Sequence, residues 1–177
     1  MRGFLPTAKA EGIHLVNRMI ILGIDPGTKI SGFGVIESQG STFKAIDFGC
    51  IRPPAEYSLP DRYLVIFNSV DALLDKHRPE ALVVETQFVK HNVQSAIKLG
   101  MARGAVMIAA ARQQIPIYEY APAKAKMAVV GNGRASKLQV QAMVQQLLRL
   151  PEPPHPEDAA DALALAICHA HQKRFLK

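Results

Sequence analysis

Two aspartates, Asp158 and Asp161, stand three residues apart in the segment PHPEDAADALALAICHA near the C-terminal end of the chain. The segment predicts a buried helix, and residues three apart lie on the same face of a helix. That face continues through Leu165 and Cys168, so the two carboxylates border an apolar core. A carboxylate in such a place is costly unless it is paired or binds a metal.

Two further acids follow apolar segments that predict buried strands. Asp25 ends the segment MIILGID, and Glu85 ends the segment ALVVE. In open α/β sheets, functional groups gather at the carboxyl ends of the strands. The sequence therefore predicts that these two acids and the helical pair, Asp158 and Asp161, lie near one edge of a sheet.

A cluster of four carboxylates needs a positive partner because the charges repel one another. Oxygen ligands suit Mg²⁺ or Mn²⁺ rather than zinc, and the nearby His155 is expected to be exposed in a proline-rich turn. Two such ions can clamp a phosphate, one activating water and the other stabilising the leaving oxygen. The four acids therefore predict metal-dependent phosphodiester hydrolysis.

Each acid also has a structural explanation of its own. Asp158 lies in the first turn of its predicted helix, where acids interact favourably with the helix dipole. Asp25 begins the common turn sequence DPGT, and a strand-end acid such as Glu85 can pair with a lysine. The dipole explains Asp161 poorly, because that residue lies one turn further into the helix.

The elements that position these acids fit into a single domain. The chain has 177 residues, of which 49% are hydrophobic and 20% charged, and no apolar run is long enough to span a bilayer. Cys50 and Cys168 are too few for a disulfide framework, so we expect free buried thiols in a cytoplasmic protein. Residues 1–18 are interpreted as a leader or flexible N-terminal arm, and residues 19–177 as the folded domain.

Hydrophobic patterning predicts an α/β fold with a five-stranded mixed sheet flanked by helices. Three antiparallel strands are expected over residues 19–50, with a hairpin turn at ESQGS. Two more strands are expected at residues 81–85 and 115–120. Helices are expected at residues 61–77, 92–114, 137–150 and 154–170.

Basic charge is concentrated in the middle of the chain. Residues 86–149 carry nine lysines and arginines and one acid, Glu119, whereas the remaining residues have a net charge of −2. This distribution favours nucleic acid as a partner over a membrane, and a solvated lysine-rich surface is the alternative. The segment GNGRASK lacks the G-K-[ST] order of a phosphate-binding loop, so we interpret it as a basic loop that touches DNA.

Four ordered segments resemble the RuvC family of bacterial Holliday junction resolvases: ILGIDPGTKISGFGVI, LVVETQFVKHNVQSAIKLGMARG, EYAPAKAKMAVVGNGRASKLQVQ and HPEDAADALALAICHAH. The resemblance extends from Met19 to about Gln172. It implies an RNase H-like fold and a homodimer that uses Mg²⁺ or Mn²⁺ to nick two symmetry-related strands of a four-way DNA junction, in homologous recombination and DNA repair. A branch-migration motor of the RuvA and RuvB type is the further partner that it implies.

The resemblance also implies roles for individual residues. The four catalytic and metal-binding positions correspond to Asp25, Glu85, Asp158 and Asp161. Phe88 corresponds to an aromatic residue that contacts junction bases, and Lys126 and Lys137 correspond to positions linked to DNA binding and catalysis. We also expect Arg134, in the basic loop, to contact DNA.

A stripe of small residues marks the predicted helix at residues 92–114. Ala96, Gly100 and Gly104 are spaced four apart and therefore lie on one helix face. Close packing against the sheet is one explanation of the stripe, and a dimer contact is the other.

Three other classes of protein fit part of the sequence. DPGT followed by a strand is typical of the first phosphate loop of actin-like and sugar-kinase-like ATPases, but the chain is too short for their second lobe. A non-catalytic nucleic-acid-binding module explains the basic region and not the acids. An RNase H-like enzyme that acts on RNA fits the charge, and only the full-length resemblance argues against it.

Overall fold

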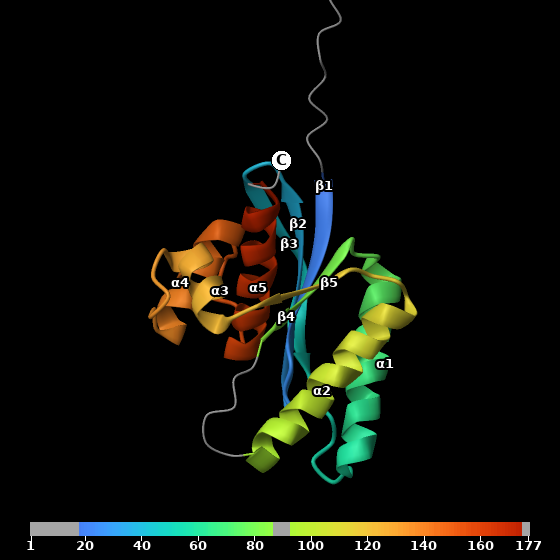
Figure 1. The fold of residues 1–177 in the computed structure, drawn as a ribbon. Coiled ribbons are helices and arrows are strands. Elements are labelled where there is room, and N and C mark those ends of the chain that lie inside the picture. The colour runs from blue at the N-terminus through green and yellow to red at the C-terminus, as the bar shows by residue number, and fades with distance from the viewer. Residues whose placement is uncertain (1–17, 87–92, 175–177) are drawn as a thin grey trace, which may run out of the picture.

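A five-stranded mixed sheet forms the centre of the computed structural model, which describes residues 18–86 and 93–174 (Figure 1). The strands are β1 (Arg18–Asp25), β2 (Ser31–Gln39), β3 (Thr42–Ile51), β4 (Ala81–Glu85) and β5 (Ile117–Tyr120). Their order in the sheet is β3-β2-β1-β4-β5. The first three strands form an antiparallel meander, and β4 and β5 extend the sheet in parallel with β1. The predicted five-stranded mixed sheet is confirmed.

The register of the sheet places the two strand-end acids on the same edge. Ile24 of β1 pairs with Val84 of β4, so Asp25 and Glu85 follow side by side at the carboxyl ends of these strands. Asp25 in turn lies opposite Gly32 of β2. The sequence-based expectation that Asp25 and Glu85 share a sheet edge is therefore confirmed.

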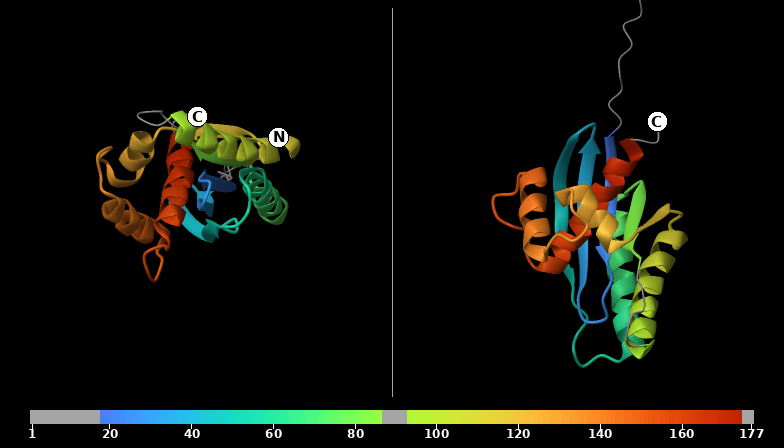
Figure 2. Two further views of the ribbon diagram at one scale, coloured as in Figure 1. Left: turned by 90° about the horizontal axis from the view of Figure 1, so that it is seen from below. Right: turned by 60° about the vertical axis from the view of Figure 1, so that its left-hand side comes forward.

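In the described residues, five helices cover the two faces of the sheet. They are α1 (Leu59–His77), α2 (Val93–Arg112), α3 (Pro122–Val130), α4 (Lys137–Leu148) and α5 (Glu157–Arg174). Helices α1 and α2 lie on one face, and α3, α4 and α5 lie on the other (Figures 1 and 2). Helix α3 forms over residues for which the sequence predicts no element. None of the helices in the described part of the chain is long and apolar enough to cross a membrane.

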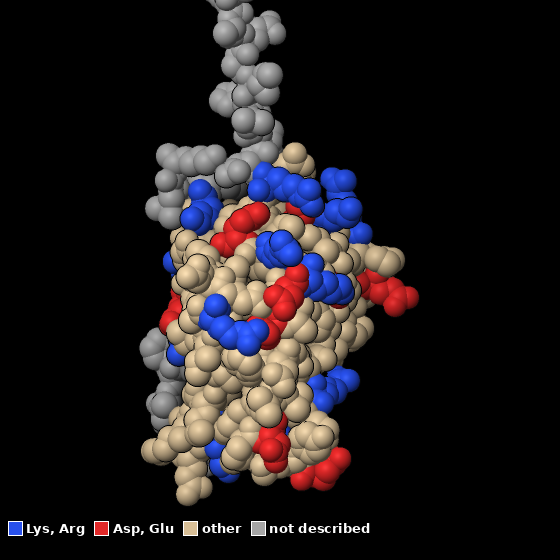
Figure 3. Space-filling view, turned by 90° about the vertical axis from the view of Figure 1, so that its right-hand side faces the viewer, with Lys and Arg blue, Asp and Glu red and all other residues tan. Residues whose placement is uncertain are grey.

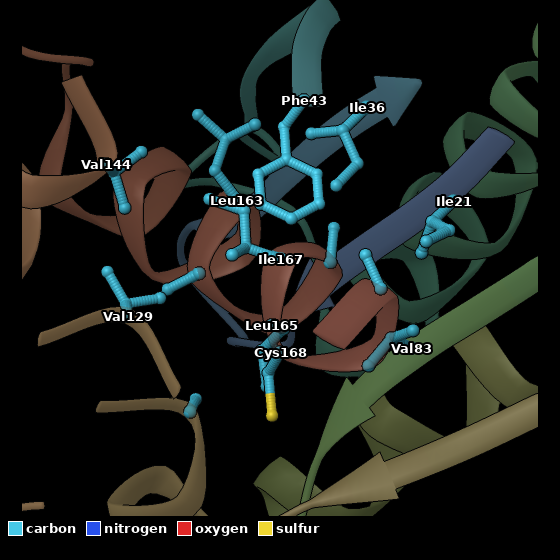
Figure 4. Close-up of a cluster of buried hydrophobic side chains, with 14 of the residues drawn as sticks. Ile21, Ile36, Phe43, Val83, Val129, Val144, Leu163, Leu165, Ile167 and Cys168 are labelled. Carbon is cyan, nitrogen blue, oxygen red and sulfur yellow. The ribbon is translucent and has the colours of Figure 1, made fainter. Parts of the chain in front are cut away.

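Helix α5 is the most deeply buried helix of the fold, which explains its apolar sequence. Every residue from 159 to 170 except Asp161 is buried. Figure 4 shows α5 between Val129 and Val144 of the neighbouring helices on one side and Ile21 and Ile36 of the sheet on the other. Because residues 159–170 are enclosed in this way, Asp161 is half-buried and His169 is fully buried.

Glycines let α5 lie directly on the backbone of the sheet. A Cβ atom on Gly32 would stand 1.9 Å from the carbonyl oxygen of Asp158, and one on Gly23 would stand 2.1 Å from that of Ala162. Both distances are far shorter than any real contact. A side chain at either glycine would push α5 away from the strand that carries Asp25.

Some sequence-based expectations differ from the structure in detail. The hairpin between β2 and β3 turns at Gly40 and Ser41, and Gly40 has a positive φ of 61° that favours glycine. Cys168 is buried as expected, but Cys50, on the edge strand β3, is only half-buried. The predicted arm at residues 1–18 lies outside the described residues, apart from Arg18, which begins β1.

The packing of α5 on Gly32 predicts that Gly32→Ala destabilises the protein. We expect a loss of about 1–3 kcal/mol in the free energy of unfolding, because the added methyl group collides with backbone. Gly49→Ala is the matched control, since its Cβ would meet only the Phe33 ring, at 3.2 Å. Urea unfolding of both variants measures the difference, and equal stabilities would show that α5 does not depend on this contact.

Candidate active site

Three of the four predicted acids line one cavity at the carboxyl edge of the sheet. The cavity has a volume of about 260 Å³, and its wall includes Asp25, Glu85 and Asp161. These acids come from β1, β4 and α5, which are far apart in sequence. Lys126 of α3 and Lys137 of α4 complete the polar part of the wall.

The fourth acid, Asp158, lies beside the cavity rather than in its wall. It is half-buried in the first turn of α5, where its carbonyl oxygen rests over Gly32. Its negative charge nevertheless acts on the cavity, because it contributes to raising the pKa values of Asp25 and Asp161. The structure thus brings all four acids into one electrostatic group, with three of them facing the cavity.

Burial and mutual repulsion raise the pKa values of acids in this group, so that simultaneous ionisation of all of them is unfavourable. Desolvation, followed by the charges of Glu85, Asp161 and Asp158, raises the pKa of Asp25 from 3.8 to about 7. Desolvation, followed by the charge of Asp161, also raises the pKa of Glu85. Negative charge in the cavity is therefore only partly balanced by the protein itself.

Two lysines supply the positive charge that the protein does place at the cavity. Lys126 is half-buried, its Nζ donates to the Ala135 carbonyl oxygen at 2.9 Å, and its charge lowers the pKa values of Glu85 and Asp161. Lys137 is more exposed, and its Nζ lies 3.6 Å from Asp161 Oδ2 and 3.4 Å from Glu157 Oε2. Desolvation would lower the pKa of Lys137, but the charge of Asp161 and the contact with Glu157 outweigh it, so the pKa is raised.

The donor set of the cavity fits a hard divalent cation. Among the described residues that line its wall, the anionic groups are all carboxylates, and none of these residues is a histidine or a cysteine. Within the described ranges, no three His, Cys, Asp or Glu side chains stand close enough together to form a ready-made metal site. Burial, followed by the charges of neighbouring acids, raises the pKa values of Asp25, Glu85 and Asp161, and a bound cation would favour their ionised forms.

Three other residues considered in the sequence analysis lie apart from the cavity wall or outside the described chain. Arg134 is exposed in the loop between α3 and α4, where its backbone N–H donates to Asn132 Oδ1 at 3.0 Å. Phe88 lies outside the described residues. His155 is exposed, as expected, and does not line the cavity.

Sequence reasoning missed two features near the site. One is the contact of Glu157 with Lys137, which joins α5 to α4. His169 was not singled out, yet it is buried in α5, and its Nδ1 lies 2.8 Å from the hydroxyl of Tyr120. Tyr120 pairs with Glu85 across β4 and β5, so this contact ties α5 to the strand beside the acid. The sequence held one indication of this role for His169, because it lies eight residues after Asp161 and therefore close to the same face of the helix.

Comparison with known proteins identifies the family of this chain. Residues 21–169 match the protein family described as crossover junction endodeoxyribonuclease RuvC. The chain belongs to the RuvC family. A RuvC from Protochlamydia amoebophila (strain UWE25) is 68% identical over 154 residues, which cover 87% of this chain and 92% of that protein. A RuvC from Chlamydia pneumoniae is 50% identical over 158 residues, with coverage of 88% and 94%.

Solved structures agree with the RuvC assignment. Thermus thermophilus RuvC in complex with a Holliday junction substrate matches with a TM-score of 0.84 and 37% identity, over 89% of this chain and 96% of that chain. The yeast mitochondrial Holliday junction resolvase Ydc2 matches with a TM-score of 0.63 and 15% identity, over 88% and 79%, and shares the fold alone. The RNase H-like fold expected from the sequence is confirmed.

The raised pKa of Asp25 predicts how the stability of the metal-free protein changes with pH. The folded state holds the Asp25 proton up to a pKa of about 7, whereas the unfolded chain releases it near 3.8. Stability therefore falls as the pH rises between these two values. Asp25→Asn removes this titration, so we expect a flatter pH dependence of stability and a higher free energy of unfolding than wild type at pH 8.

Urea unfolding in EDTA at pH 5 and pH 8 provides the measurement. The charged groups acting on Asp25 are Glu85, Asp161, Asp158 and Lys137, and all of them stay in the variant. The difference between wild type and variant therefore isolates Asp25. Parallel pH profiles for the two proteins would contradict the prediction.

Proposed function

We propose that this RuvC protein is a structure-selective DNA endonuclease that resolves Holliday junctions by paired, metal-dependent phosphodiester hydrolysis in homologous recombination and DNA repair. One observation carries this proposal: Asp25, Glu85 and Asp161, from three separate elements, line one cavity together with two lysines. The solved complex of Thermus thermophilus RuvC, 37% identical to this chain, with a Holliday junction substrate supports the choice of DNA.

The acids of the cavity would hold the metal cofactor, which we propose to be two Mg²⁺ ions, with Mn²⁺ as a substitute. Asp25, Glu85 and Asp161 would be ligands from the cavity wall, and Asp158 a ligand from its rim. When bound, the ions would supply an activated water and stabilise the leaving oxygen of the cleaved phosphodiester. Their positive charge would also favour ionisation of Asp25, whose pKa of about 7 otherwise keeps part of it protonated.

The basic groups around the cavity would receive the DNA backbone. Lys126 is held against the cavity by its bond to Ala135, so its ammonium is positioned beside the acids before DNA arrives. Lys137 and Arg134 are exposed and can reach phosphate oxygens. Phe88 would contact junction bases, on the basis of the family resemblance and its position three residues after Glu85.

We further propose that two copies act together as a homodimer through α2. Val93, Ile97, Met101 and Ile108 expose apolar side chains along this helix. A Cβ atom on Gly100 or Gly104 would have no neighbour within 4 Å, so these glycines do not serve close packing on the sheet. Figure 3 shows the α1 and α2 side with charged side chains mainly in its upper half and a few at its lower end, and with uncharged surface between them.

A homodimer suits the substrate, because a four-way junction offers two equivalent strands and a two-fold dimer offers two matching sites. The small glycines would let two copies of α2 approach closely, and the apolar side chains around them would be removed from water. A branch-migration motor of the RuvA and RuvB type is the further partner that we propose, with the cytoplasm as the place of action.

The proposed metal site predicts that Asp161→Asn abolishes chemistry and preserves the fold. The substitution keeps the shape of the side chain but removes an anionic ligand, so we expect nicking of a four-way junction to fall by orders of magnitude, with junction binding retained. The melting temperature without metal should be unchanged or slightly higher, because carboxylate repulsion is relieved.

Glu85→Gln, distant in sequence, should have the same effect as Asp161→Asn if both residues serve one metal site. Glu152→Gln, at an exposed acid in the turn before α5, is the control and should nick normally. Junction nicking, a gel shift and a melting curve for each variant test the prediction. If Asp161 served only the helix dipole, its variant would lose at most about 1 kcal/mol of stability and would nick like wild type.

The proposed dimer predicts that Met101→Glu produces monomers. Met101 is 53% exposed on α2, and a charge placed there would be buried against the second copy, so we expect dimerisation to weaken at least about tenfold. Met127→Glu, at a methionine of α3 that is 54% exposed, is the matched control. Sedimentation equilibrium of the two variants measures the effect, and equal dimer fractions would exclude α2 as the interface.

A further inference from the structure

Lys137 is shared between two carboxylates that have different positions in the site. Its Nζ lies 3.6 Å from Asp161 Oδ2, in the cavity, and 3.4 Å from Glu157 Oε2, at the rim. The Asp161 side chain is 23% exposed, whereas that of Glu157 is 53% exposed. Glu157 is not one of the four acids assigned to the metal, so its contact with Lys137 calls for another explanation.

The backbone of Lys137 is held in place, so a change of partner between Asp161 and Glu157 requires movement of its side chain alone. Ser136 caps the N-terminus of α4, where its Oγ accepts from the Gln139 N–H and its own N–H donates to Gln139 Oε1. Lys126 anchors the preceding residue, Ala135, through its carbonyl oxygen. These contacts fix the origin of the Lys137 side chain beside the cavity.

Asp161 cannot serve the lysine and a divalent cation equally well at the same time. An ammonium group paired with a carboxylate occupies its lone pairs and reduces the negative charge that a cation would meet. A second carboxylate near the lysine lowers this competition, because the ammonium keeps a favourable partner when it leaves Asp161. Glu157 is such a carboxylate, because its Oε2 lies within ion-pair distance of Lys137 Nζ, as Asp161 Oδ2 does.

We propose that Glu157 is a positioning residue that draws Lys137 towards the rim of the cavity and so keeps Asp161 available to the divalent cation. The inference rests on the proposed metal-dependent function. Glu157 acts through Lys137 and does not touch the reacting atoms. Its effect should therefore depend on Lys137 being present.

A double-mutant cycle on metal binding tests this dependence. Mn²⁺ affinity of the full-length protein is measured by electron paramagnetic resonance, without DNA, for wild type, Glu157→Gln, Lys137→Gln and the double variant. We expect Glu157→Gln to weaken Mn²⁺ binding by about two- to fivefold, the size of effect that exposed ion pairs produce. Lys137→Gln should tighten binding, and adding Glu157→Gln to it should change little.

Further variants separate this role from the general effects of a charge. Glu157→Asp should keep Mn²⁺ affinity closer to wild type than Glu157→Gln, because it keeps a carboxylate near Lys137. Glu152→Gln removes an exposed acid outside the ion pair and should leave affinity unchanged. Melting curves show whether a variant has lost stability through the helix dipole, an effect that would not depend on Lys137.

Two results would overturn the proposal, and they can be told apart. If Glu157→Gln weakened Mn²⁺ binding equally with and without Lys137, or left it unchanged in both, Glu157 would not act through the lysine, and the metal-dependent function would stand. If wild type bound no Mn²⁺ and nicked junctions in EDTA, the proposed function would fall together with this inference.

Discussion

The direct contact between the backbone of α5 and the backbone of the sheet is the constraint on which the site depends. Gly23 and Gly32 leave no room for a side chain between the strands and the carbonyl oxygens of α5. The helix that carries Asp158 and Asp161 therefore lies as close as possible to the strand that carries Asp25. A thicker spacer of side chains would separate these acids and reduce the repulsion that marks the site.

The charge balance at the cavity follows from this close packing. Burial and proximity raise the pKa values of Asp25, Glu85 and Asp161, while Lys126 and Lys137 lower those of Glu85 and Asp161. The protein thus offsets only part of the negative charge that it assembles. What remains favours a divalent cation, and the lysines that stand beside it are also suited to a DNA phosphate.

The two proposed functions, catalysis and dimerisation, involve opposite faces of the sheet. On one face, α3 and α4 contribute lysines to the cavity and α5 contributes Asp161. On the other face, α2 exposes apolar side chains and small residues. The cavity and the proposed dimer face are therefore built from different elements. A two-fold dimer through α2 can leave both cavities open, as a paired cut of a symmetric junction requires.

The amino-acid sequence by itself determined the type of fold, the positions of most elements and the chemistry of the acids. Apolar segments ending at Asp25 and Glu85 are local patterns, and so is the three-residue spacing of Asp158 and Asp161. These patterns also predicted that the four acids lie near one edge of the sheet, and the resemblance to RuvC added the roles of individual residues. Tertiary structure alone decided that Asp158 does not line the cavity with the other three acids, that Lys126 bonds to Ala135, and that Lys137 is shared between Asp161 and Glu157. These contacts join residues on different elements, and their distances depend on how closely α5 approaches the sheet, which no local pattern encodes.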